Sequence, residues 1–332
     1  MDLKKIHLPQ FIFELESNSI PVVIKYAKDI SQQRETHQIV ITDLRKHMNP
    51  TADIYFGDNL DILKKIKSES VNLVYVDPPF NTGKIQSRTR IKTTRSEKGD
   101  RKGFKGNTYK TEILGKKSYS DIFDNYIDFL RPRIEATKRI LAPNGSFFLH
   151  LDYREIHYAK VMCDEIFGRD SFINEIIWSY DYGAKSRTKW PTKHDNILWY
   201  AKDPNNFTFR YDDIDRIPYM APSLVGPEKA AKGKIPTDSW WHTIVSPNSK
   251  EKTGYPTQKP LGIINRIIKV HSNPEDMILD YFAGSGTTGI AALNFGRNAI
   301  LIDSNIEALE IMEKRFNSES TRFHNWTTKI DA

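Results

Sequence analysis

The chain has 332 residues, of which 39% are hydrophobic and 27% are charged. This composition is typical of a globular protein and argues against a disordered or membrane-spanning one, because no run of 18 apolar residues is present. The amino-terminal sequence lacks the apolar core and small-residue cleavage site of a signal peptide, so we expect a cytoplasmic location. The single cysteine, Cys163, excludes an internal disulfide and a zinc cluster, and its apolar neighbours predict a buried helical position.

The net charge of +7 is concentrated in one segment, residues 84–118, which holds twelve Lys and Arg residues against three Asp and Glu. We therefore expect a polyanionic partner. We interpret residues 84–118 as a mobile basic loop that can close on a phosphate backbone. A solvated loop with no partner is the alternative.

The first 50 residues have mixed patterns, and no function is inferred for them. From residue 53 a β-α-β unit is predicted, because apolar residues form short strands at 54–56 and 73–76 and recur at helical spacing over 59–67.

The second of these strands ends in the sequence LVYVDPPFNTG, residues 73–83. It must stop at Asp77, because Pro78 and Pro79 have no backbone donor. Asp77 and the Pro78 carbonyl then become two rigid acceptors with Phe80 beside them. Such an arrangement suits an amino group and the ring that carries it, and a simple proline turn after a strand is the alternative.

Helices and strands alternate over the next part of the chain. The predicted elements are a helix at 119–141 that Pro132 kinks or divides, a strand at 146–152, a helix at 153–167, and strands at 175–179 and 196–201. This alternation predicts an α/β fold with a doubly wound, mostly parallel sheet. His150 and Asp152 end their strand at the same sheet edge as Asp77 and are candidates to line a ligand pocket there. The alternative for His150 is a structural role, and the alternative for Asp152 is to cap the following helix.

Residues 203–255 are rich in proline and lack periodicity, which indicates a separate module or an insertion. Five of the six tryptophans fall between residues 178 and 241, interleaved with Lys185, Arg187 and Lys189. Aromatic residues among basic ones suit contact with nucleic acid, although burial in a small subdomain explains the tryptophans equally well.

Regular structure resumes near residue 261. The predicted elements are helices at 261–271, 287–295 and 305–316 and strands at 277–282 and 299–302.

A glycine-rich turn follows the first of these strands, with Gly284, Gly286 and Gly289 in GxGxxG spacing. Glycines let the backbone approach a ligand closely, and the amides of the next helix face that ligand. Asp303, at the tip of the following strand, is placed to accept hydrogen bonds from ribose hydroxyls.

Only 29 residues follow Asp303, too few for the several strands that a dinucleotide-binding domain builds after its first turn. The missing strands must come from earlier in the chain. We therefore expect a circularly permuted sheet in which the strand at 277–282 lies beside residues 73–77, so that both strand tips border one ligand site.

The order of motifs resembles one known family. It resembles the β-class of DNA amino-methyltransferases that use S-adenosylmethionine. In both, DPPF is followed by a variable region, then by TQKP (257–260 here) and then by FAGSG. The sequence GYPTQKP is similar to that of adenine methyltransferases from restriction-modification systems. Asp77 at the first position of DPPF points to adenine, since serine is usual there in the N4-cytosine relatives.

The resemblance implies a Rossmann-like methyltransferase fold with a seven-stranded sheet and an inserted target-recognition region. It implies double-stranded DNA as the partner, with no membrane partner, and makes a cognate restriction endonuclease and a second copy of the chain further candidates. The implied domains are an extension (1–52), a catalytic half with the basic loop (53–202), the target-recognition insertion (203–255, or starting near 181) and a cofactor-binding half (256–332).

The resemblance also assigns roles to residues. The expected catalytic residues are Asp77, Pro78, Pro79 and Phe80. The expected cofactor-binding residues are Asp58, Asp77, Lys259, Pro260, Asp280, Phe282, Ala283, Gly284, Ser285, Gly286, Thr287 and Asp303, with Asp58 near the adenine and Lys259 near the methionine end. The expected DNA-binding residues are Lys84, Arg88, Arg90, Lys185, Arg187 and Lys189, and no metal is expected.

The expected reaction is direct methyl transfer to N6 of a flipped adenine, with Asp77 and the Pro78 carbonyl holding the amino group. Cys163 is remote in sequence from both strand tips, which argues against C5-cytosine chemistry. Three alternatives remain: an N4-cytosine methyltransferase, a nicotinamide-dependent oxidoreductase, and a non-catalytic DNA-binding protein.

Overall fold

The computed structural model describes residues 22–27, 38–43, 50–96, 100–102, 108–121, 123, 125–181, 185–246 and 248–325. The chain divides into two compact units, Met1–Pro50 and Thr51–Ala332. In the first unit, β1 (Val22–Ala27) and β2 (Gln38–Asp43) pair antiparallel. The four predicted domains stay a prediction.

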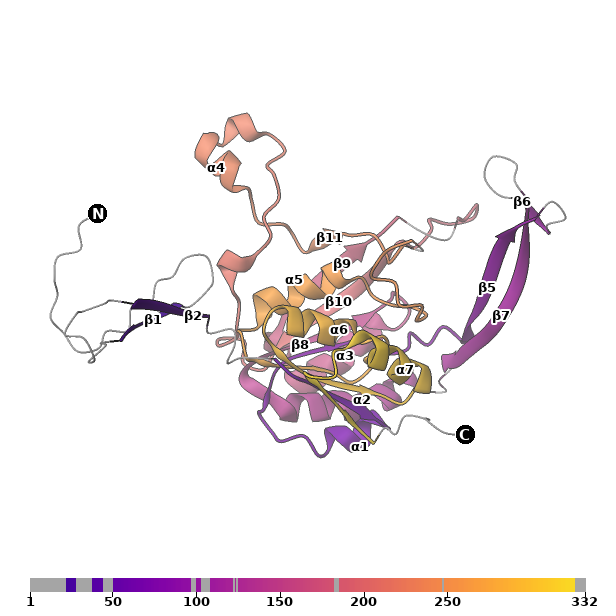
Figure 1. Cartoon of the computed structure of the whole chain (residues 1–332), viewed down its shortest axis with the longest axis horizontal. Helices are drawn as coiled ribbons and strands as arrows, with labels where there is room; N and C mark the ends of the chain where they lie inside the picture. The colour runs from indigo at the N-terminus through magenta and orange to yellow at the C-terminus, as the bar shows by residue number, and fades with distance from the viewer. Residues whose placement is uncertain are drawn as a thin grey trace. The chain divides into compact units, whose positions relative to one another are not determined.

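The second unit is built on one large sheet, in which the described residues form nine strands (Figure 1). Their order across the sheet is β11-β9-β10-β8-β4-β12-β13-β3-β14. The strands are β3 (Ala52–Phe56), β4 (Val71–Val76), β8 (Leu141–Leu151), β9 (Phe172–Ser179), β10 (His194–Ala201), β11 (Ser239–Trp241), β12 (Met277–Asp280), β13 (Asn298–Asp303) and β14 (Thr321–His324). Only β10 runs antiparallel to its neighbours among them, so the sheet is mostly parallel, as predicted.

Helices cover both faces of this sheet. They are α1 (Asn59–Leu63), α2 (Tyr126–Ile140), α3 (Ile156–Phe167), α5 (Leu261–His271), α6 (Thr287–Asn294) and α7 (Ile306–Arg315), and a short α4 (Pro227–Lys232) lies in the proline-rich region. Alternate residues of β4 point to opposite faces. Leu73 and Tyr75 join the core formed with α5, α6 and α7, whereas Val74 and Val76 join the core formed with α1, α2 and α3. The doubly wound arrangement is therefore confirmed.

The permuted order is also confirmed. Strand β12 pairs in parallel with β4, with Ile278 opposite Leu73 and Leu279 opposite Val74. Because both strands run in the same direction, their carboxyl ends lie at one edge of the sheet. Asp77 and the glycine turn after Asp280 therefore meet there, although some 200 residues separate them in the chain.

The expectation of seven strands is wrong. β14 adds a parallel edge strand beside β3, and β11 pairs in parallel with β9 at the other edge. Both are short and only partly buried, so they lack the apolar run that reveals a central strand. β9 and β10 also form an antiparallel hairpin where continued parallel winding was expected.

The basic segment is not a loop along its whole length. β5 (Lys84–Arg95) pairs antiparallel with β7 (Thr108–Asp121), and β6 (Arg101–Lys102) pairs with β7, whereas residues 97–99 and 103–107 lie outside the described residues. This hairpin is the pair of long strands labelled β5 and β7 in Figure 1. Threonine and isoleucine in this segment favour strands. Polar residues occur throughout it, however, so the alternation of apolar and polar residues that predicts a strand is missing.

The helix expected at 119–141 begins only at Tyr126, because residues up to Asp121 belong to β7. Pro132 lies inside α2 without dividing it. One missing backbone hydrogen bond is offset by the packing of the apolar face of α2, which includes the fully buried Leu130 and Ile134.

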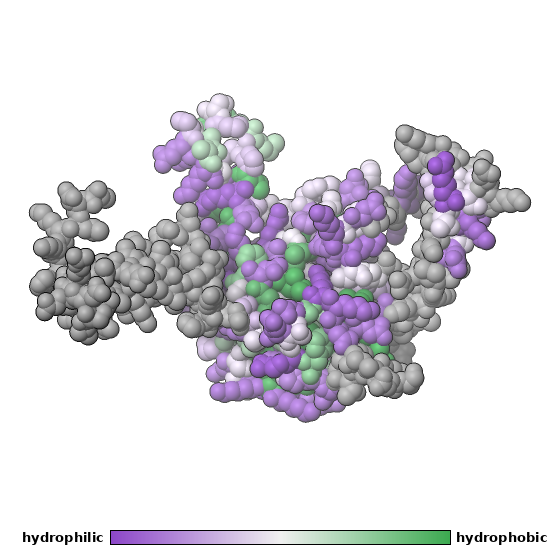
Figure 2. Space-filling model, in the orientation of Figure 1, coloured by the Kyte–Doolittle hydropathy of each residue, from purple (hydrophilic) through white to green (hydrophobic). Residues whose placement is uncertain are grey.

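The outer surface of the described residues in Figure 2 is largely hydrophilic, with apolar side chains gathered around α5. None of the helices in the described part of the chain combines the length and the apolar character that crossing a membrane requires.

Candidate active site

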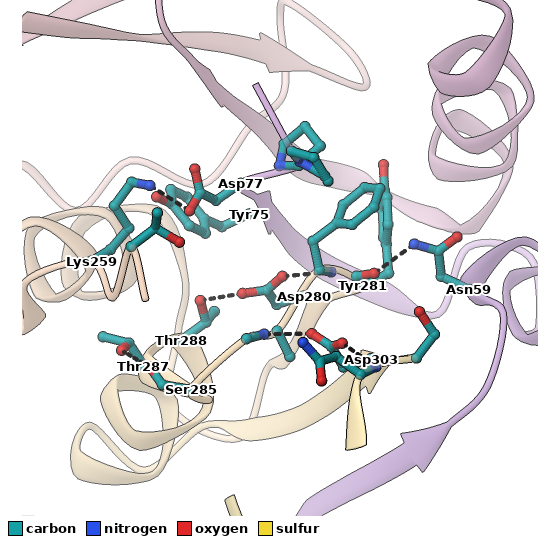
Figure 3. Close-up of a pocket in the computed structure, with 18 of the residues that line it drawn as sticks. Asn59, Tyr75, Asp77, Lys259, Asp280, Tyr281, Ser285, Thr287, Thr288 and Asp303 are labelled. Carbon is teal, nitrogen blue, oxygen red and sulfur yellow. Dashed lines mark hydrogen bonds and ion pairs between the residues drawn. The ribbon is translucent and has the colours of Figure 1, made fainter. Parts of the chain in front are cut away.

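A cavity of about 340 Å³ opens at the sheet edge where β4, β12 and β13 end. Most of the predicted cofactor and catalytic residues line this first cavity (Figure 3). They are Asp58, Asp77, Pro78, Pro79, Phe80, Lys259, Asp280, Phe282, Ala283, Gly284, Ser285, Thr287 and Asp303.

Two predicted residues do not line the first cavity. Pro260 is buried and precedes the first residue of α5. Gly286 precedes α6 with φ +75°, and an added Cβ there would lie 2.7 Å from the Phe316 ring and 2.9 Å from Met312. Gly286 thus faces the packed core, which makes its role in the turn structural.

Asp77 lies at the tip of β4, where Figure 3 shows it facing Lys259. Lys259 Nζ donates to Asp77 Oδ2 at 2.5 Å and sits 4.8 Å from the centre of the Phe80 ring. Asp77 Oδ1 is buried and has no hydrogen-bond partner among the described residues. One oxygen of the carboxylate is therefore oriented by a cation, and the other is an available acceptor.

The DPPF turn is held in place by its neighbours. Tyr126 donates through its hydroxyl to the Pro79 carbonyl at 2.5 Å. Asn81, which has φ +51°, donates to Glu155 at 2.7 Å and accepts from the Phe123 backbone at 3.1 Å. These contacts tie the turn to three segments outside β4, so its acceptors have a defined direction.

The glycine turn is held by two carboxylates. Asp303 accepts from the Gly284 backbone at 2.7 Å through Oδ2 and from the Asn305 backbone at 2.8 Å through Oδ1. Asp280 accepts from the Phe282 backbone at 3.0 Å and from Thr288 Oγ1 at 2.6 Å.

Burial raises the pKa values of Asp280 and Asp303, and the pKa of Asp280 reaches about 7. Asp280 shapes the turn through its two hydrogen bonds, and its contact with the cofactor stays a prediction. Asp303 accepts from three backbone amides, those of Gly284, Ser304 and Asn305, which leaves acceptor capacity for a ligand.

The far wall of the first cavity comes from α1 and α2. Asp58 caps α1 by accepting from the Leu60 backbone at 2.8 Å and lies 3.4 Å from Arg133 Nη2. Arg133 Nε donates to Asn59 at 2.7 Å, and its guanidinium lies 4.0 Å from the centre of the Phe129 ring. This wall combines a carboxylate, a guanidinium and an aromatic ring.

Sequence reasoning missed these α2 residues, because a side chain on a distant helix carries no local signal of its place in a pocket. The lining residues that were not predicted are Asn59, Tyr75, Thr82, Phe123, Phe129, Arg133, Tyr255, Thr257, Gln258, Ile264, Tyr281, Thr288, Ser304 and Asn305. Tyr255, Thr257 and Gln258 belong to the recognised GYPTQKP segment, so the motif itself could have indicated them.

A second cavity, of about 650 Å³, adjoins the first. Both are lined by Phe80, Tyr255, Thr257, Gln258 and Lys259. The rest of the second cavity is formed by Asp152, Arg154, Trp178, Tyr180, Asp195, Ile244, Val245, Lys252 and Pro256. Phe80 and Lys259 therefore stand at the junction of the two cavities.

A chain of buried hydrogen bonds runs behind this junction. The Tyr75 hydroxyl lies 2.6 Å from His150 Nδ1, and His150 Nε2 lies 3.2 Å from Asp195 Oδ2. Tyr180 donates to Asp195 Oδ1 at 3.1 Å. Burial alone would raise the pKa of Asp195, but its contacts with His150, Lys259 and Tyr180 lower it below the ordinary value. Asp195 is thus ionised, and since a carboxylate only accepts, His150 Nε2 carries a proton.

Two open questions about this edge are answered. His150 is fully buried and lines neither cavity, so its role is structural. Asp152 is not the helix cap, because Glu155 precedes α3 and no side-chain hydrogen bond caps this helix. Asp152 instead accepts from the Arg154 backbone at 3.0 Å, pairs with the Arg154 side chain, and lines the second cavity but not the first.

The predicted DNA-binding residues fall in two places. Lys84, Arg88 and Arg90 lie on β5, and their side chains are outside the described residues. Lys185, Arg187 and Lys189 are exposed in the loop between β9 and β10. Of the six, the three in this loop are described, and they line neither cavity.

Cys163 is fully buried on α3, as expected, and burial raises the pKa of its thiol. In the part of the chain that the structure describes, no group of three or more His, Cys, Asp or Glu residues is arranged to hold a metal ion.

Comparison with known proteins identifies related sequences. A family model described as DNA methylase matches residues 71–314. The chain is 30% identical over 285 residues to the DNA adenine methyltransferase YhdJ of Escherichia coli strain K12, which covers 82% of this chain and 85% of YhdJ. It is 28% identical over 261 residues to the type II methyltransferase M.HpaI of Haemophilus parainfluenzae, which covers 79% of this chain and 73% of M.HpaI.

Two solved structures share the fold. The PvuII DNA methyltransferase, described as cytosine-N4-specific, matches with a TM-score of 0.55 and 18% identity over 82% of this chain and 88% of its own. M1.HpyAVI in complex with SAM matches with a TM-score of 0.50 and 25% identity over 80% of this chain and 99% of its own.

The raised pKa of Asp280 predicts a pH dependence of stability. Between pH 4 and 7 the folded protein keeps a proton on Asp280 that the unfolded chain releases, so the free energy of unfolding falls as pH rises through this window. Asp280→Asn removes this contribution. We expect the stability of the wild type relative to the variant to fall by about 3 kcal/mol between pH 4.5 and 7.5. Urea denaturation at several pH values measures it, and parallel curves for the two proteins contradict it.

Proposed function

The chain belongs to the family of DNA methylases that matches residues 71–314, and we propose that it transfers a methyl group from S-adenosylmethionine to N6 of a flipped adenine in duplex DNA. Membership makes it a site-specific DNA methyltransferase of the N6-adenine or N4-cytosine type. The adenine assignment and the role of each residue are the proposal.

The first cavity suits the cofactor. Gly284 has φ +52°, and an added Cβ would lie 3.0 Å from the Tyr255 ring, so the turn has no space for a side chain. Asp303 has lone pairs left for ribose hydroxyls, Asp58 and Phe282 border the same space, and Lys259 offers a positive charge. When bound, S-adenosylmethionine supplies an electrophilic methyl group carried on a positively charged sulfur.

The observation that carries the proposal is the Oδ1 atom of Asp77, which is buried in the first cavity and has no hydrogen-bond partner among the described residues. The other carboxylate oxygen pairs with Lys259, which borders both cavities. An exocyclic amino group is a poor nucleophile, because its lone pair is delocalised into the ring. Asp77 Oδ1 accepts one N–H of that group and the Pro78 carbonyl accepts the other, which stabilises the positive charge that develops on nitrogen. The ring of Phe80 stacks on the base, which enters through the second cavity.

Adenine is proposed over cytosine because Asp77 occupies the first position of DPPF and because the chain resembles an adenine methyltransferase at 30% identity. The similarity to the cytosine-N4-specific enzyme, at 18% identity, concerns the fold alone. We also propose a cytoplasmic location and, from the type II relatives, a cognate restriction endonuclease as partner. A homodimer stays a prediction.

One experiment tests the function. DNA incubated with the protein and S-adenosylmethionine is digested to nucleosides and, in parallel, sequenced with modification-sensitive reads. We expect N6-methyladenine at one short sequence. N4-methylcytosine without N6-methyladenine contradicts the choice of base, and no methylated base of either kind contradicts the function.

Asp77→Ala tests the catalytic assignment. We expect methyl transfer to fall by at least about 100- to 1,000-fold, because an electrostatic contact to the developing charge is lost. The dissociation constant of S-adenosylmethionine should stay within a few fold. Single-turnover methylation and equilibrium cofactor binding measure the two effects separately. A variant that loses only cofactor binding contradicts the assignment of Asp77 to the amino group.

Lys259→Met tests the second role at the junction. If Lys259 binds the carboxylate of the cofactor, its loss raises the dissociation constant of S-adenosylmethionine about 10- to 100-fold through a charge-assisted hydrogen bond. Isothermal titration with cofactor alone measures this. Unchanged cofactor affinity combined with slower methyl transfer shows instead that Lys259 serves only to orient Asp77.

The basic hairpin is tested by the salt dependence of DNA binding. The logarithm of the DNA-binding constant falls linearly with the logarithm of the salt concentration. Changing Lys84, Arg88 and Arg90 to glutamine should make this slope shallower by up to about 2.7, at about 0.9 for each lost phosphate contact. The matched control removes the same charge from the exposed Lys64, Lys65 and Lys67 near α1 and should leave the slope unchanged. Equal slopes for both variants locate the DNA away from the hairpin.

A further inference from the structure

Trp190 is 94% exposed, although tryptophan is among the side chains that gain most from burial. Trp178 and Trp199 are 2% and 5% exposed in the same unit. The exposure of Trp190 has no explanation in the packing of the described residues, which makes it a candidate contact for a partner.

The position of Trp190 is set by local structure. Ser186 Oγ accepts from the Thr188 backbone at 3.2 Å and from the Lys189 backbone at 3.1 Å, forming a turn just before the tryptophan. Pro191 follows directly and restricts the residue before it to extended backbone. The indole is therefore held out from the loop between β9 and β10.

The base of this loop lies at the second cavity. The Tyr180 backbone donates to the Lys193 carbonyl at 3.0 Å, and Lys193 Nζ lies 3.3 Å from Asp181. Tyr180 itself lines the second cavity. Trp190 is three residues from Lys193, which an extended chain spans in about 10 Å. The loop that carries the indole therefore begins and ends beside the second cavity.

The charge of the loop identifies the partner. Lys185, Arg187, Lys189 and Lys193 surround Trp190, and no Asp or Glu occurs from residue 182 to 194. The four cations suit the phosphates of a polyanion, and the indole suits the exposed face of another ring. Duplex DNA with an opened base stack offers both.

We propose that Trp190 is a wedge that stacks on the base pairs next to the flipped nucleotide and so stabilises the extruded state. Extrusion leaves a gap in the stack, and filling that gap with an aromatic ring replaces the stacking that was lost. Trp190 is a positioning residue in this scheme, since it does not touch the reacting atoms. The inference rests on the proposed function, because it requires a base to flip.

The test uses the full chain and the recognition sequence mapped by modification-sensitive sequencing. Single-turnover methylation is compared for the wild type, Trp190→Ala, Trp190→Phe and the control Tyr158→Ala, whose side chain is 67% exposed on α3. Each protein is tested on a paired duplex and on one with an abasic site opposite the target, where extrusion is less unfavourable.

We expect Trp190→Ala to be about 10- to 100-fold slower on the paired duplex and within about threefold of the wild type on the abasic one. Trp190→Phe should recover most of the rate, and Tyr158→Ala should match the wild type on both duplexes. A 2-aminopurine in place of the target base should become less fluorescent in the Trp190→Ala complex than in the wild-type complex, because less of it is extruded.

Equal losses on both duplexes, or no loss on either, overturn the wedge. Wild-type rates together with a changed oligomeric state of Trp190→Ala overturn it in favour of a protein contact. If the wild type methylates no DNA at all, the proposed function fails, whereas methylation that is indifferent to Trp190 refutes only this inference.

Discussion

The parallel pairing of β4 with β12 is the contact on which the rest of the structure depends. It joins two strands some 200 residues apart and places their carboxyl ends side by side. A strand that ends in proline and a strand that ends in glycine then border one cavity. The first presents rigid acceptors and the second a turn without side-chain bulk, so the pairing brings together two chemically different halves of one site.

Electrostatics at this edge are organised around Asp77 and Lys259. The lysine comes from the segment before α5 and pairs with one oxygen of the carboxylate, while the other oxygen is buried and has no partner in the described part of the chain. The same lysine lies over Phe80, and both residues border both cavities. Lys259 therefore contacts both the acceptor and the ring.

The second cavity is shaped by a part of the sheet that departs from parallel winding. The β9–β10 hairpin supplies Trp178, Tyr180 and Asp195 to the wall of this cavity, and the loop between its two strands carries Trp190. The buried chain from Tyr75 through His150 to Asp195 links this hairpin to β4. Fully paired buried networks of this kind are rigid, so this chain of hydrogen bonds ties the β9–β10 hairpin to the strand that carries Asp77.

The two strand tips, Asp77 with its prolines and the glycine turn with Asp303, could be predicted from the sequence alone. Proline fixes φ and removes a donor, and glycine permits backbone conformations that other residues avoid, so both leave a local signal. The sequence also predicted that the strand at 277–282 lies beside residues 73–77, which the pairing of β12 with β4 confirms. The three-dimensional fold is needed to see that Arg133 and Phe129 line the cavity and that Lys259 leaves one oxygen of Asp77 available. It is also needed to see that residues 84–95 and 108–121 form a hairpin. These features depend on contacts between distant residues or on a ladder of backbone hydrogen bonds between polar strands, and neither leaves a periodic trace in the sequence.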